Sequence, residues 1–216
     1  MSKELFEFDA KFNNLVVGTD EAGRGPGAGG VFAAAVYFPE KTEKLIDELE
    51  ILNDSKKLTA KKRESIYDLI LNNTINSVVC VEVEEIERIN ILNASLKAMK
   101  LACEDVISKI CSEDKTPLVL VDGNKLIKDF KIPQKYIIKG DSRSASIAAA
   151  SILAKVTRDR YMKNLSLIYP EYGWDKNAGY LTKSHLEAID KYGVSPYHRP
   201  SFLKKHFAKC EQLTIF

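Results

Sequence analysis

The chain has 216 residues, enough for one large domain, or for one domain with a smaller C-terminal addition, and for a substantial buried core. Its composition, 45% hydrophobic and 29% charged, is typical of an ordinary globular protein. No apolar run is as long as a membrane span and the N-terminus lacks signal-peptide architecture, so we expect a cytoplasmic protein. The formal net charge of +2 argues neither for nor against a nucleic-acid partner.

Two strands are predicted within residues 16–39, where both apolar runs are short and bounded by Gly and Pro. Asp20 and Glu21 close the first run, and the turn Gly23-Arg24-Gly25 follows at once. Two acids at a strand end beside a flexible, cationic turn are poor core material. They suit a site that holds a divalent metal next to a phosphate.

Further elements follow in an alternating order. We expect a short surface helix over 41–50, a helix capped by Thr59, a third strand over 75–83, and helical structure over 84–111 with a fresh start at Asn90. The apolar run 117–123 predicts a fourth, fully buried strand ending in Asp122-Gly123, and 135–139 a short fifth strand followed by Asp141.

A long helix is expected from Ser142 onward, with a buried first half, a basic second half and an end at Pro170 and Gly173. Two shorter helices follow, over 182–192 and 201–209. The order predicts an α/β fold with a mixed five-stranded sheet flanked by helices. We expect a core over residues 1–170 and a small helical C-terminal extension over 171–216.

Two well-known glycine motifs in the opening segment fail on context. Gly25, Gly27 and Gly30 match the dinucleotide fingerprint, but a predicted strand follows them instead of the required helix. Residues 18–25 resemble the start of a P-loop, but Arg24-Gly25 stands where a lysine and a hydroxyl residue are needed. A nucleotide cofactor site is therefore not expected here.

The acids form a more persuasive set. Asp20, Glu21, Asp122 and Asp141 all follow predicted strands, and the carboxyl ends of parallel strands gather on one edge of an α/β sheet. Such a cluster repels itself unless some members take up protons or a hard cation such as Mg²⁺ binds. Three of the acids also have a local alternative, a turn for Asp20 and Asp122 and a helix N-cap for Asp141.

Other polar residues carry weaker signals. The cysteines show no zinc-ligand spacing and are expected to be reduced and mostly buried: Cys80, Cys103, Cys111 and Cys210. Lysines and arginines cluster at 56–57, 61–63 and 204–205, where solvated helix faces are the commoner explanation. His185 and His206 lack a partner pattern and are expected on the surface.

The whole set resembles the type 2 ribonucleases H, specifically bacterial ribonuclease HII. The motifs that carry the resemblance run in family order over nearly the whole chain: DEAGRGP at 20–26, DSKKL at 54–58, VDG at 121–123, KGD at 139–141, AASILAKVTRD at 149–159, GYLT at 179–182 and HRPSF at 198–202. Two departures stand out. GPGAGGV replaces the usual GPLAGPV, and Leu181 stands where the family often has Gly. The second departure bears on how Tyr180 is presented.

The resemblance implies a ribonuclease H-like fold and a metal-dependent endoribonuclease. It would hydrolyse RNA in RNA–DNA hybrids and cut on the 5′ side of single ribonucleotides in duplex DNA. Two Mn²⁺ or Mg²⁺ ions would be held by the acids already named, Asp20, Glu21, Asp122 and Asp141. Backbone groups of Gly23, Arg24 and Gly25 would read the ribose 2′-hydroxyl, and Tyr180 would stack on the deoxyribose just 3′ of the ribonucleotide.

Lys56, Lys57 and Arg143 become candidates for phosphate contacts under the same resemblance, whereas His198 is expected to pin the C-terminal loop and Lys155 and Asp159 to be structural. The last five residues resemble the pentapeptide by which bacterial proteins dock on the replication sliding clamp, with Gln212, Leu213, Ile215 and Phe216 as its contacts. A frayed tail is the alternative.

Two alternative functions stay open on the sequence. A ribonuclease HIII-type enzyme would carry an extra N-terminal domain and usually Glu at the fourth acidic position, so the short lead before Asp20 and the presence of Asp141 argue against it. A nonenzymatic nucleic-acid binder of the same fold would be expected to have lost an acid. A monomer is expected, although no sequence feature reports on oligomeric state.

Overall fold

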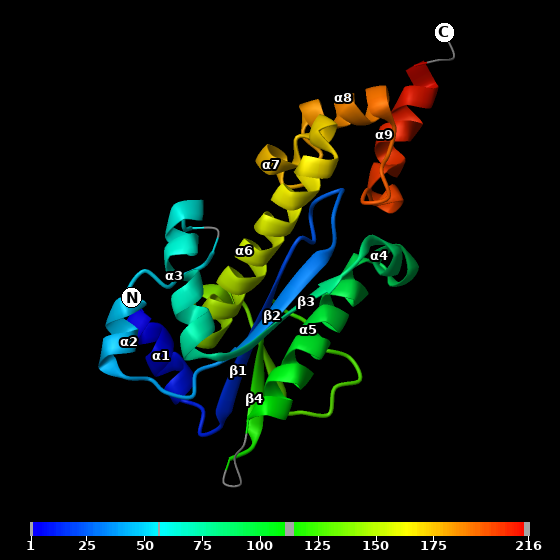
Figure 1. Cartoon of the computed structure of the whole chain (residues 1–216). Coiled ribbons are helices and arrows are strands. Elements are labelled where there is room, and N and C mark those ends of the chain that lie inside the picture. The colour runs from blue at the N-terminus through cyan, green and yellow to red at the C-terminus, as the bar shows by residue number, and fades with distance from the viewer. Residues whose placement is uncertain (1, 56, 111–114, 214–216) are drawn as a thin grey trace.

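A mixed five-stranded sheet forms the centre of the molecule, as predicted (Figure 1). The computed structural model describes residues 2–55, 57–110 and 115–213, with side chains described to residue 208. The strands are β1 (Leu15–Ala22), β2 (Val31–Tyr37), β3 (Ile75–Val81), β4 (Pro117–Asp122) and β5 (Gln134–Ile137), in the order β3-β2-β1-β4-β5. The pairs β1–β4 and β4–β5 are parallel, so the ends of these three strands share one edge of the sheet.

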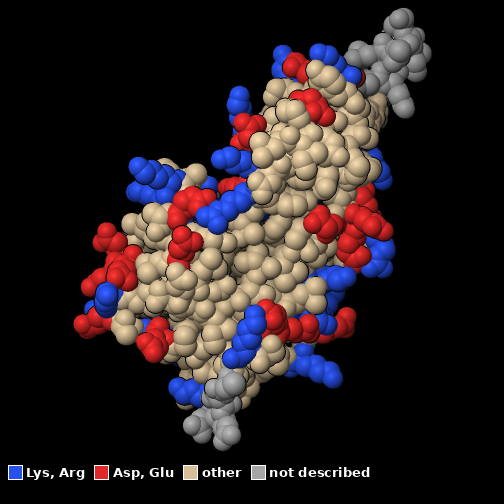
Figure 2. All heavy atoms as spheres, in the orientation of Figure 1, with Lys and Arg blue, Asp and Glu red and all other residues tan. Residues whose placement is uncertain are grey.

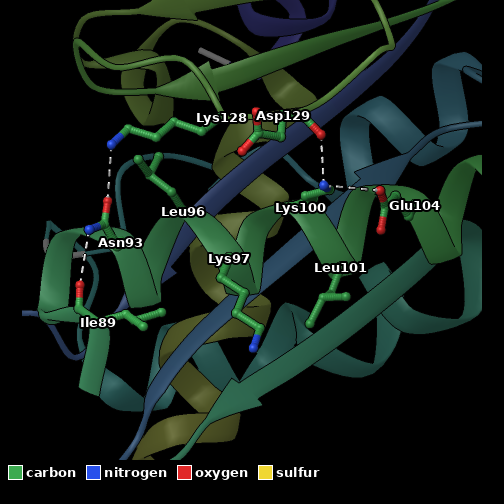
Figure 3. Close-up of a pocket in the computed structure, with 9 residues that line it drawn as sticks. All are labelled: Ile89, Asn93, Leu96, Lys97, Lys100, Leu101, Glu104, Lys128 and Asp129. Atoms are coloured by element: carbon green, nitrogen blue, oxygen red, sulfur yellow. Dashed lines mark hydrogen bonds and ion pairs between the residues drawn. The ribbon is translucent and has the colours of Figure 1, made fainter. Parts of the chain in front are cut away.

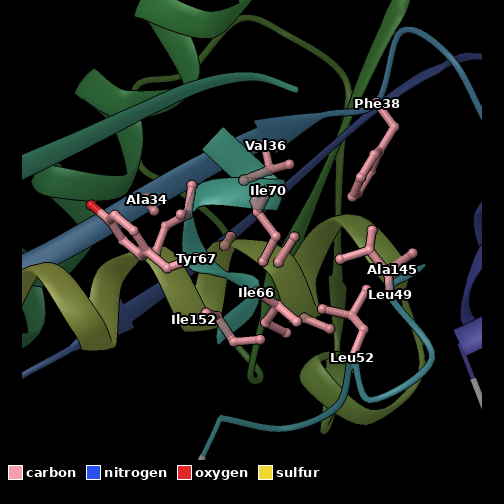
Figure 4. Packing of buried hydrophobic residues seen from close by; sticks show 14 of the residues in the cluster. Ala34, Val36, Phe38, Leu49, Leu52, Ile66, Tyr67, Ile70, Ala145 and Ile152 are labelled. Carbon is pink, nitrogen blue, oxygen red and sulfur yellow. The ribbon is translucent and has the colours of Figure 1, made fainter. Parts of the chain in front are cut away.

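Helices cover both faces of the sheet. On one face, α6 (Ala145–Ile168) and α3 (Ala60–Asn73) pack with α1 (Ser2–Ala10) and α2 (Glu43–Glu48) around a core that includes Ile66, Ile70 and Ile152 (Figure 4). On the other face, α5 (Ile91–Lys109) buries Met99 and Val106 against strand residues such as Val17, and α4 (Val83–Ile89) adds Ile86. The strand side chains alternate between the two cores, as the period of a β-strand requires.

A close approach between β1 and the start of α6 fixes the layout of the predicted site. Gly18 lies so near this helix that an added Cβ would sit 2.3 Å from Ile147 N. Only glycine permits that distance, and it brings the start of α6 against the centre of the sheet. The turn that precedes α6, Gly140–Ser142, is thereby set beside the ends of β1 and β4.

The N-terminal helix α1 was not predicted. Its Leu5 and Phe6 are buried in the α6 core, and Asp9 is buried at its C-terminal end. Asp9 Oδ2 accepts a hydrogen bond of 2.9 Å from Ser146 N, in the first turn of α6. Burial raises the pKa of Asp9, and hydrogen bonds from Ser144 and Ser146 partly oppose this. The helix therefore anchors the start of α6 from outside.

The predicted helix starts are confirmed at two caps and corrected at a third. Thr59 caps α3 and Asn90 caps α5, each through a side-chain oxygen that accepts a backbone N–H. The long helix begins at Ala145 rather than near Ser142, because a 3₁₀ turn over Gly140–Ser142 intervenes and Ser144 is the N-cap. The N-cap alternative for Asp141 is thus wrong.

The chain after α6 forms a separate apolar cluster beyond the end of the sheet (Figure 1). It is built from α7 (Trp174–Asn177), α8 (Lys183–Tyr192) and α9 (Pro200–Leu213), which pack on the second half of α6 through Met162, Leu165 and Trp174. Within the described residues, no helix is long and apolar enough to cross a membrane.

Candidate active site

Four predicted site carboxylates lie at the shared edge of β1, β4 and β5. Asp20 is 6% exposed and Asp141 is 7% exposed, whereas Glu21 and Asp122 are half-buried at the strand ends. Asp122 Oδ1 accepts a hydrogen bond of 2.7 Å from Gly140 N, which ties the end of β4 to the turn that carries Asp141. Asp20 Oδ1 accepts one of 2.7 Å from Glu21 N.

Burial and mutual repulsion dominate the electrostatics of this edge. Burial raises the pKa of Asp20 well above its usual range, and the charges of Glu21, Asp122 and Asp141 raise it further. The pKa of Asp20 responds to all three other acids, so the four carboxylates interact as one group. At neutral pH the cluster is unfavourable without a compensating cation, as the sequence suggested.

The donor set fits a hard divalent cation, because every side chain in it offers carboxylate oxygens and the repulsion among them would be relieved by positive charge. The side chains are not already closed around one point. In the part of the chain that the structure describes, no three His, Cys, Asp or Glu side chains form a ready cage for a metal ion. Ligation would therefore draw these carboxylates inward.

The turn after β1 approaches the acids through Arg24. The Arg24 Nη1 atom lies 3.2 Å from Glu21 Oε1, and half of the arginine side chain is exposed. Gly23 has a φ of +103°, and an added Cβ would meet the Arg158 side chain at 2.3 Å. Both the backbone conformation and the space around Gly23 therefore require glycine.

Two buried arginines that the sequence did not single out hold this turn in place. Arg158 donates from its guanidinium to Gly30 O, Ala178 O and Ala28 O at 3.0 to 3.3 Å. Arg199 donates to Pro26 O at 2.8 Å and twice to Gly29 O, at 2.6 and 2.9 Å.

Burial, together with the neighbouring charge of Arg158, lowers the pKa of Arg199 to about 9. Arg158 lies in the motif AASILAKVTRD and Arg199 in HRPSF, so a motif match could have flagged both. Only the fold shows that the two arginines bind backbone carbonyls within residues 26–30.

The Tyr180 segment packs against the same turn. The Tyr180 side chain is 51% exposed, and its Cε1 atom would lie 3.3 Å from a Cβ added to Gly25. Its carbonyl accepts a hydrogen bond of 2.9 Å from His185 Nδ1. Tyr180, predicted to stack on the deoxyribose, therefore lies against the Gly23-Arg24-Gly25 turn, which is predicted to contact the ribose.

His185 is fully buried, so its predicted surface position is wrong. Its Nε2 atom lies 3.0 Å from the donor Trp174 Nε1 and 3.1 Å from His198 Nε2, while His198 Nδ1 accepts from Ser195 N. These contacts are mutually consistent if both imidazoles are neutral, and burial lowers the pKa of both. His198 pins the C-terminal loop, as expected.

His206 also departs from its predicted status, since it is half-buried and lies 2.7 Å from Asp190 Oδ1. The cysteine expectation is confirmed for Cys103, a buried free thiol, whereas Cys80 is half-buried. Cys111 and the side chain of Cys210 lie outside the described residues.

The predicted phosphate contacts differ in placement. Lys57 lines a hollow of about 310 Å³ together with Asp54, Asp122, Lys139 and Asp141, whereas Lys56 lies outside the described residues. Arg143 is exposed and stacks over the Phe8 ring of α1, with 5.1 Å between Cζ and the ring centroid. Lys57 thus faces the acids, and Arg143 flanks them.

Lys155 and Asp159 have a structural contact set, as expected. Lys155 Nζ lies 2.6 Å from Asp159 Oδ1, and Arg63 Nη2 lies 3.6 Å from Asp159 Oδ2. Arg63 also donates to Ser55 O and Leu58 O. These residues therefore anchor the loop that carries Lys57 to the middle of α6.

A basic hollow of about 490 Å³ lies between α3, α6 and α7. Its four cations, Lys155, Arg160, Lys163 and Lys176, outnumber its three acids, Glu64, Asp159 and Asp175. Lys155 is paired with Asp159 and Arg160 with Glu64. Figure 2 shows Lys and Arg side chains on both sides of the indentation between α3 and the helical end of the molecule. A larger hollow on α5 contains none of the predicted site residues, and its rim lysines bind Asn93, Glu104 and the Asp129 carbonyl (Figure 3).

The predicted tail contacts are only partly described. The backbone of Gln212 and Leu213 belongs to the last turn of α9, whereas Ile215 and Phe216 lie outside the described residues.

Comparison with known proteins agrees with this geometry. A family model for Ribonuclease HII matches residues 17–210. The chain belongs to the ribonuclease HII family. The Ribonuclease HII of Fusobacterium nucleatum is 51% identical over 215 residues, covering 99% of this chain and 97% of that protein. Membership makes the protein a ribonuclease H-type endoribonuclease, a hydrolase.

Solved structures give the same fold. A ribonuclease HII in complex with PCNA from Archaeoglobus fulgidus superposes with a TM-score of 0.68 at 23% identity, covering 86% of this chain and 93% of that chain. Bst-RNase HIII in complex with Mn²⁺ superposes with a TM-score of 0.68 at 17% identity, covering 92% and 67%. The ribonuclease H-like architecture predicted from the sequence is therefore confirmed.

Proposed function

We propose that the protein cleaves the phosphodiester bond on the 5′ side of a ribonucleotide, both in RNA–DNA hybrids and at single ribonucleotides in duplex DNA. The products would carry 3′-hydroxyl and 5′-phosphate ends. The observation that carries this proposal is the convergence of Asp20, Glu21, Asp122 and Asp141 at one sheet edge, directly beside the Gly23-Arg24-Gly25 turn. The reaction would serve removal of ribonucleotides from DNA in the cytoplasm.

The four carboxylates would hold Mn²⁺ or Mg²⁺, with two ions per site. The raised pKa of Asp20 supports this, because it reflects burial first and then repulsion by the other acids, and bound cations would offset both by favouring the charged carboxylate. The Mn²⁺ complex of the structurally similar Bst-RNase HIII is consistent with the proposal. Bound cations would supply Lewis-acid stabilisation of the phosphoryl group and lower the pKa of a coordinated water.

The protein's own residues would select and orient the substrate. The backbone of Gly23, Arg24 and Gly25 would contact the ribose 2′-hydroxyl, the group that distinguishes RNA from DNA. Tyr180, half-exposed against Gly25, would stack on the deoxyribose that follows. Arg158 and Arg199 would keep the turn's carbonyls from rotating, so that its N–H groups face the sugar.

Phosphate contacts would extend from the acids across the basic hollow. Lys57 would grip the backbone beside the scissile phosphate, and Lys56 and Arg143 would add further phosphate contacts. Lys163 and Lys176 would meet the flanking duplex. We take residues 171–216 as a C-terminal extension that completes this surface beside the core of residues 1–170.

The C-terminal pentapeptide would dock on the replication sliding clamp through Gln212, Leu213, Ile215 and Phe216. The PCNA complex of the Archaeoglobus fulgidus ribonuclease HII supports a partner of this class. Pull-down by the clamp should succeed with the full chain and fail when the last five residues are removed. Equal retention of both forms would refute the docking.

Cleavage of a duplex DNA that carries one ribonucleotide tests the catalytic proposal. We expect a single cut 5′ of the ribonucleotide with Mn²⁺ or Mg²⁺ and none in an all-DNA duplex. Asp20→Asn and Asp141→Asn should each lose at least about a thousandfold in rate, equivalent to about 4 kcal/mol. Asp105→Asn, on the exposed face of α5, is the matched control and should stay near wild type. Activity that survives a chelator, or survives both Asn changes, would contradict the proposal.

A further inference from the structure

Leu181 occupies the space where a side chain at position 27 would stand. A Cβ added to Gly27 would lie 2.5 Å from Leu181 Cδ2, 2.6 Å from Cγ and 2.8 Å from Cδ1. The φ of Gly27 is not in the left-handed region, so glycine is required there by space and not by backbone conformation. The isobutyl group of Leu181 is therefore seated directly on the backbone of the turn.

Backbone hydrogen bonds join the two segments on either side of this contact. Gly27 N donates to Gly179 O at 2.9 Å, and Gly27 O accepts from Arg199 N at 2.8 Å. Gly179, with a φ of +83°, passes so close to Ala28 that an added Cβ would lie 2.6 Å from its carbonyl oxygen. The connection between β1 and β2 thus meets the turn before α8 over a short, tightly packed stretch (Figure 1).

Tyr180 stands between these fixed points. Residue 179 is bonded to the turn, the Tyr180 carbonyl accepts from His185 Nδ1 and Thr182 N, and Leu181 rests on Gly27. The ring is left half-exposed, with its Cε1 edge near Gly25. A change in the distance between the Leu181 side chain and the Gly27 backbone would therefore shift the Tyr180 ring relative to Gly25.

We propose that Leu181, seated on Gly27, is a positioning residue that sets the gap between the Tyr180 ring and the Gly25 backbone, and so the preference for an RNA-to-DNA junction. The inference rests on the proposed function, in which Tyr180 contacts the deoxyribose and Gly25 the ribose. A sugar–phosphate unit must fit between the two, so a small shift of the ring changes which junctions fit.

The test is a double-mutant cycle between positions 27 and 181. Gly27→Ala, Leu181→Ala and the double variant are compared by their junction preference, the ratio of kcat/KM on duplex DNA with one ribonucleotide to kcat/KM on an all-RNA strand paired with DNA. Gly27→Ala should lower this ratio about tenfold, because displacement of reacting groups by about 1 Å costs up to 100-fold. The double variant should recover to within about threefold of wild type, since Leu181→Ala removes Cγ, Cδ1 and Cδ2 and leaves room for the methyl group added at position 27.

The same three changes are then made in a Tyr180→Ala background, where the ratio should no longer respond to position 27 or 181. Leu186→Ala, in the same apolar cluster, is the packing control and should lower stability without altering the ratio. The emission of Trp174, the single tryptophan of the chain, checks that each variant retains the local fold.

Three outcomes would overturn the inference: an equal loss by Gly27→Ala on both substrates, additive losses in the double variant, or an effect that persists without the Tyr180 ring. Failure of the proposed function looks different. If Tyr180→Ala alone leaves the ratio unchanged, junction reading by Tyr180 is wrong and this inference falls with it. If Tyr180→Ala lowers the ratio but Gly27→Ala does not, only the inference fails.

Discussion

At the end of β1, four carboxylates lie close enough for three of them to raise the pKa of the fourth, Asp20. The residues that follow β1 are instead held by hydrogen bonds from two buried arginines, Arg158 and Arg199. The carboxylate edge is electrostatically unfavourable on its own. The reader turn, residues 23–30, has its carbonyls at residues 26, 28, 29 and 30 bonded to Arg158 or Arg199.

The contrast follows from what each region has to do. In the proposed function the four carboxylates ligate cations, and until these bind, the mutual repulsion of the carboxylates lowers the stability of the protein. In the proposed function the turn distinguishes ribose from deoxyribose, and it must be held rigidly because loss of geometry costs selectivity. The rigid turn and the buried start of α6 hold the four carboxylates close together despite their mutual repulsion.

The largest effect on stability should come from removing an arginine that binds the carbonyls of the reader turn. Arg199→Ala should lower the free energy of unfolding by about 3 kcal/mol or more, because buried carbonyls lose charged donors at about 1–3 kcal/mol each. Arg160→Ala, an exposed arginine of α6 paired with Glu64, is the matched control and should cost less than about 1 kcal/mol. Urea denaturation measures both free energies of unfolding. Equal losses in the two variants would show that the turn does not depend on the hydrogen bonds of Arg199.

The second-largest effect on stability should come from acidification, through His198, the residue before Arg199. Burial, and secondarily the electrostatic interaction with His185 that protonation would create, lowers the pKa of His198 to about 4, below the value of about 6.5 in an unfolded chain. The unfolded state therefore binds more protons between these values. The contribution to stability is fully present above about pH 6.5 and is lost as the pH falls toward about 4, by up to about 3 kcal/mol for His198.

Unfolding free energies of wild type and His198→Gln between pH 7 and pH 4.5 measure this effect. The variant keeps a donor toward His185 but cannot take up a proton, so its pH dependence should be shallower than that of wild type. Parallel curves for the two proteins would contradict a neutral, buried His198.

The smallest effect should come from the basic hollow. Lys163→Gln with Lys176→Gln should weaken binding of duplex DNA several-fold at low salt and reduce the salt slope of log K by up to about 2. Stability and the position of the cut should not change, because both lysines stand away from the turn and the acids. An unchanged salt slope would exclude this hollow from the path of the duplex.

Much of this arrangement could be predicted from the sequence. The strand ends at Asp20 and Asp122 followed from short apolar runs, and the caps at Thr59 and Asn90 from local hydrogen-bonding chemistry. Parallel neighbours then imply that strand ends meet. The family motifs added roles that spacing alone does not give, such as those of Tyr180 and the reader turn.

The parts that were missed depend on contacts between distant segments. His185 has no local partner pattern, yet it lies between Trp174, His198 and the Tyr180 carbonyl. The role of Asp9 follows only from the hydrogen bond that it accepts from Ser146 N, which is far away in the sequence. Two of the positions that depart from the family pattern, Gly27 and Leu181, are separate in the sequence but touch in the fold, so neither can be interpreted alone.

The central claim, that the carboxylate edge is unfavourable until cations bind, is tested most directly by the melting temperature of wild type and Asp20→Asn in chelator and in Mn²⁺. Because the pKa of Asp20 is raised in the folded state, its charged form lowers stability at neutral pH. Asp20→Asn should therefore melt above wild type in chelator. Mn²⁺ should raise the Tm of wild type and leave that of the variant nearly unchanged. A variant that melts below wild type in chelator, or a wild type indifferent to Mn²⁺, would contradict the account.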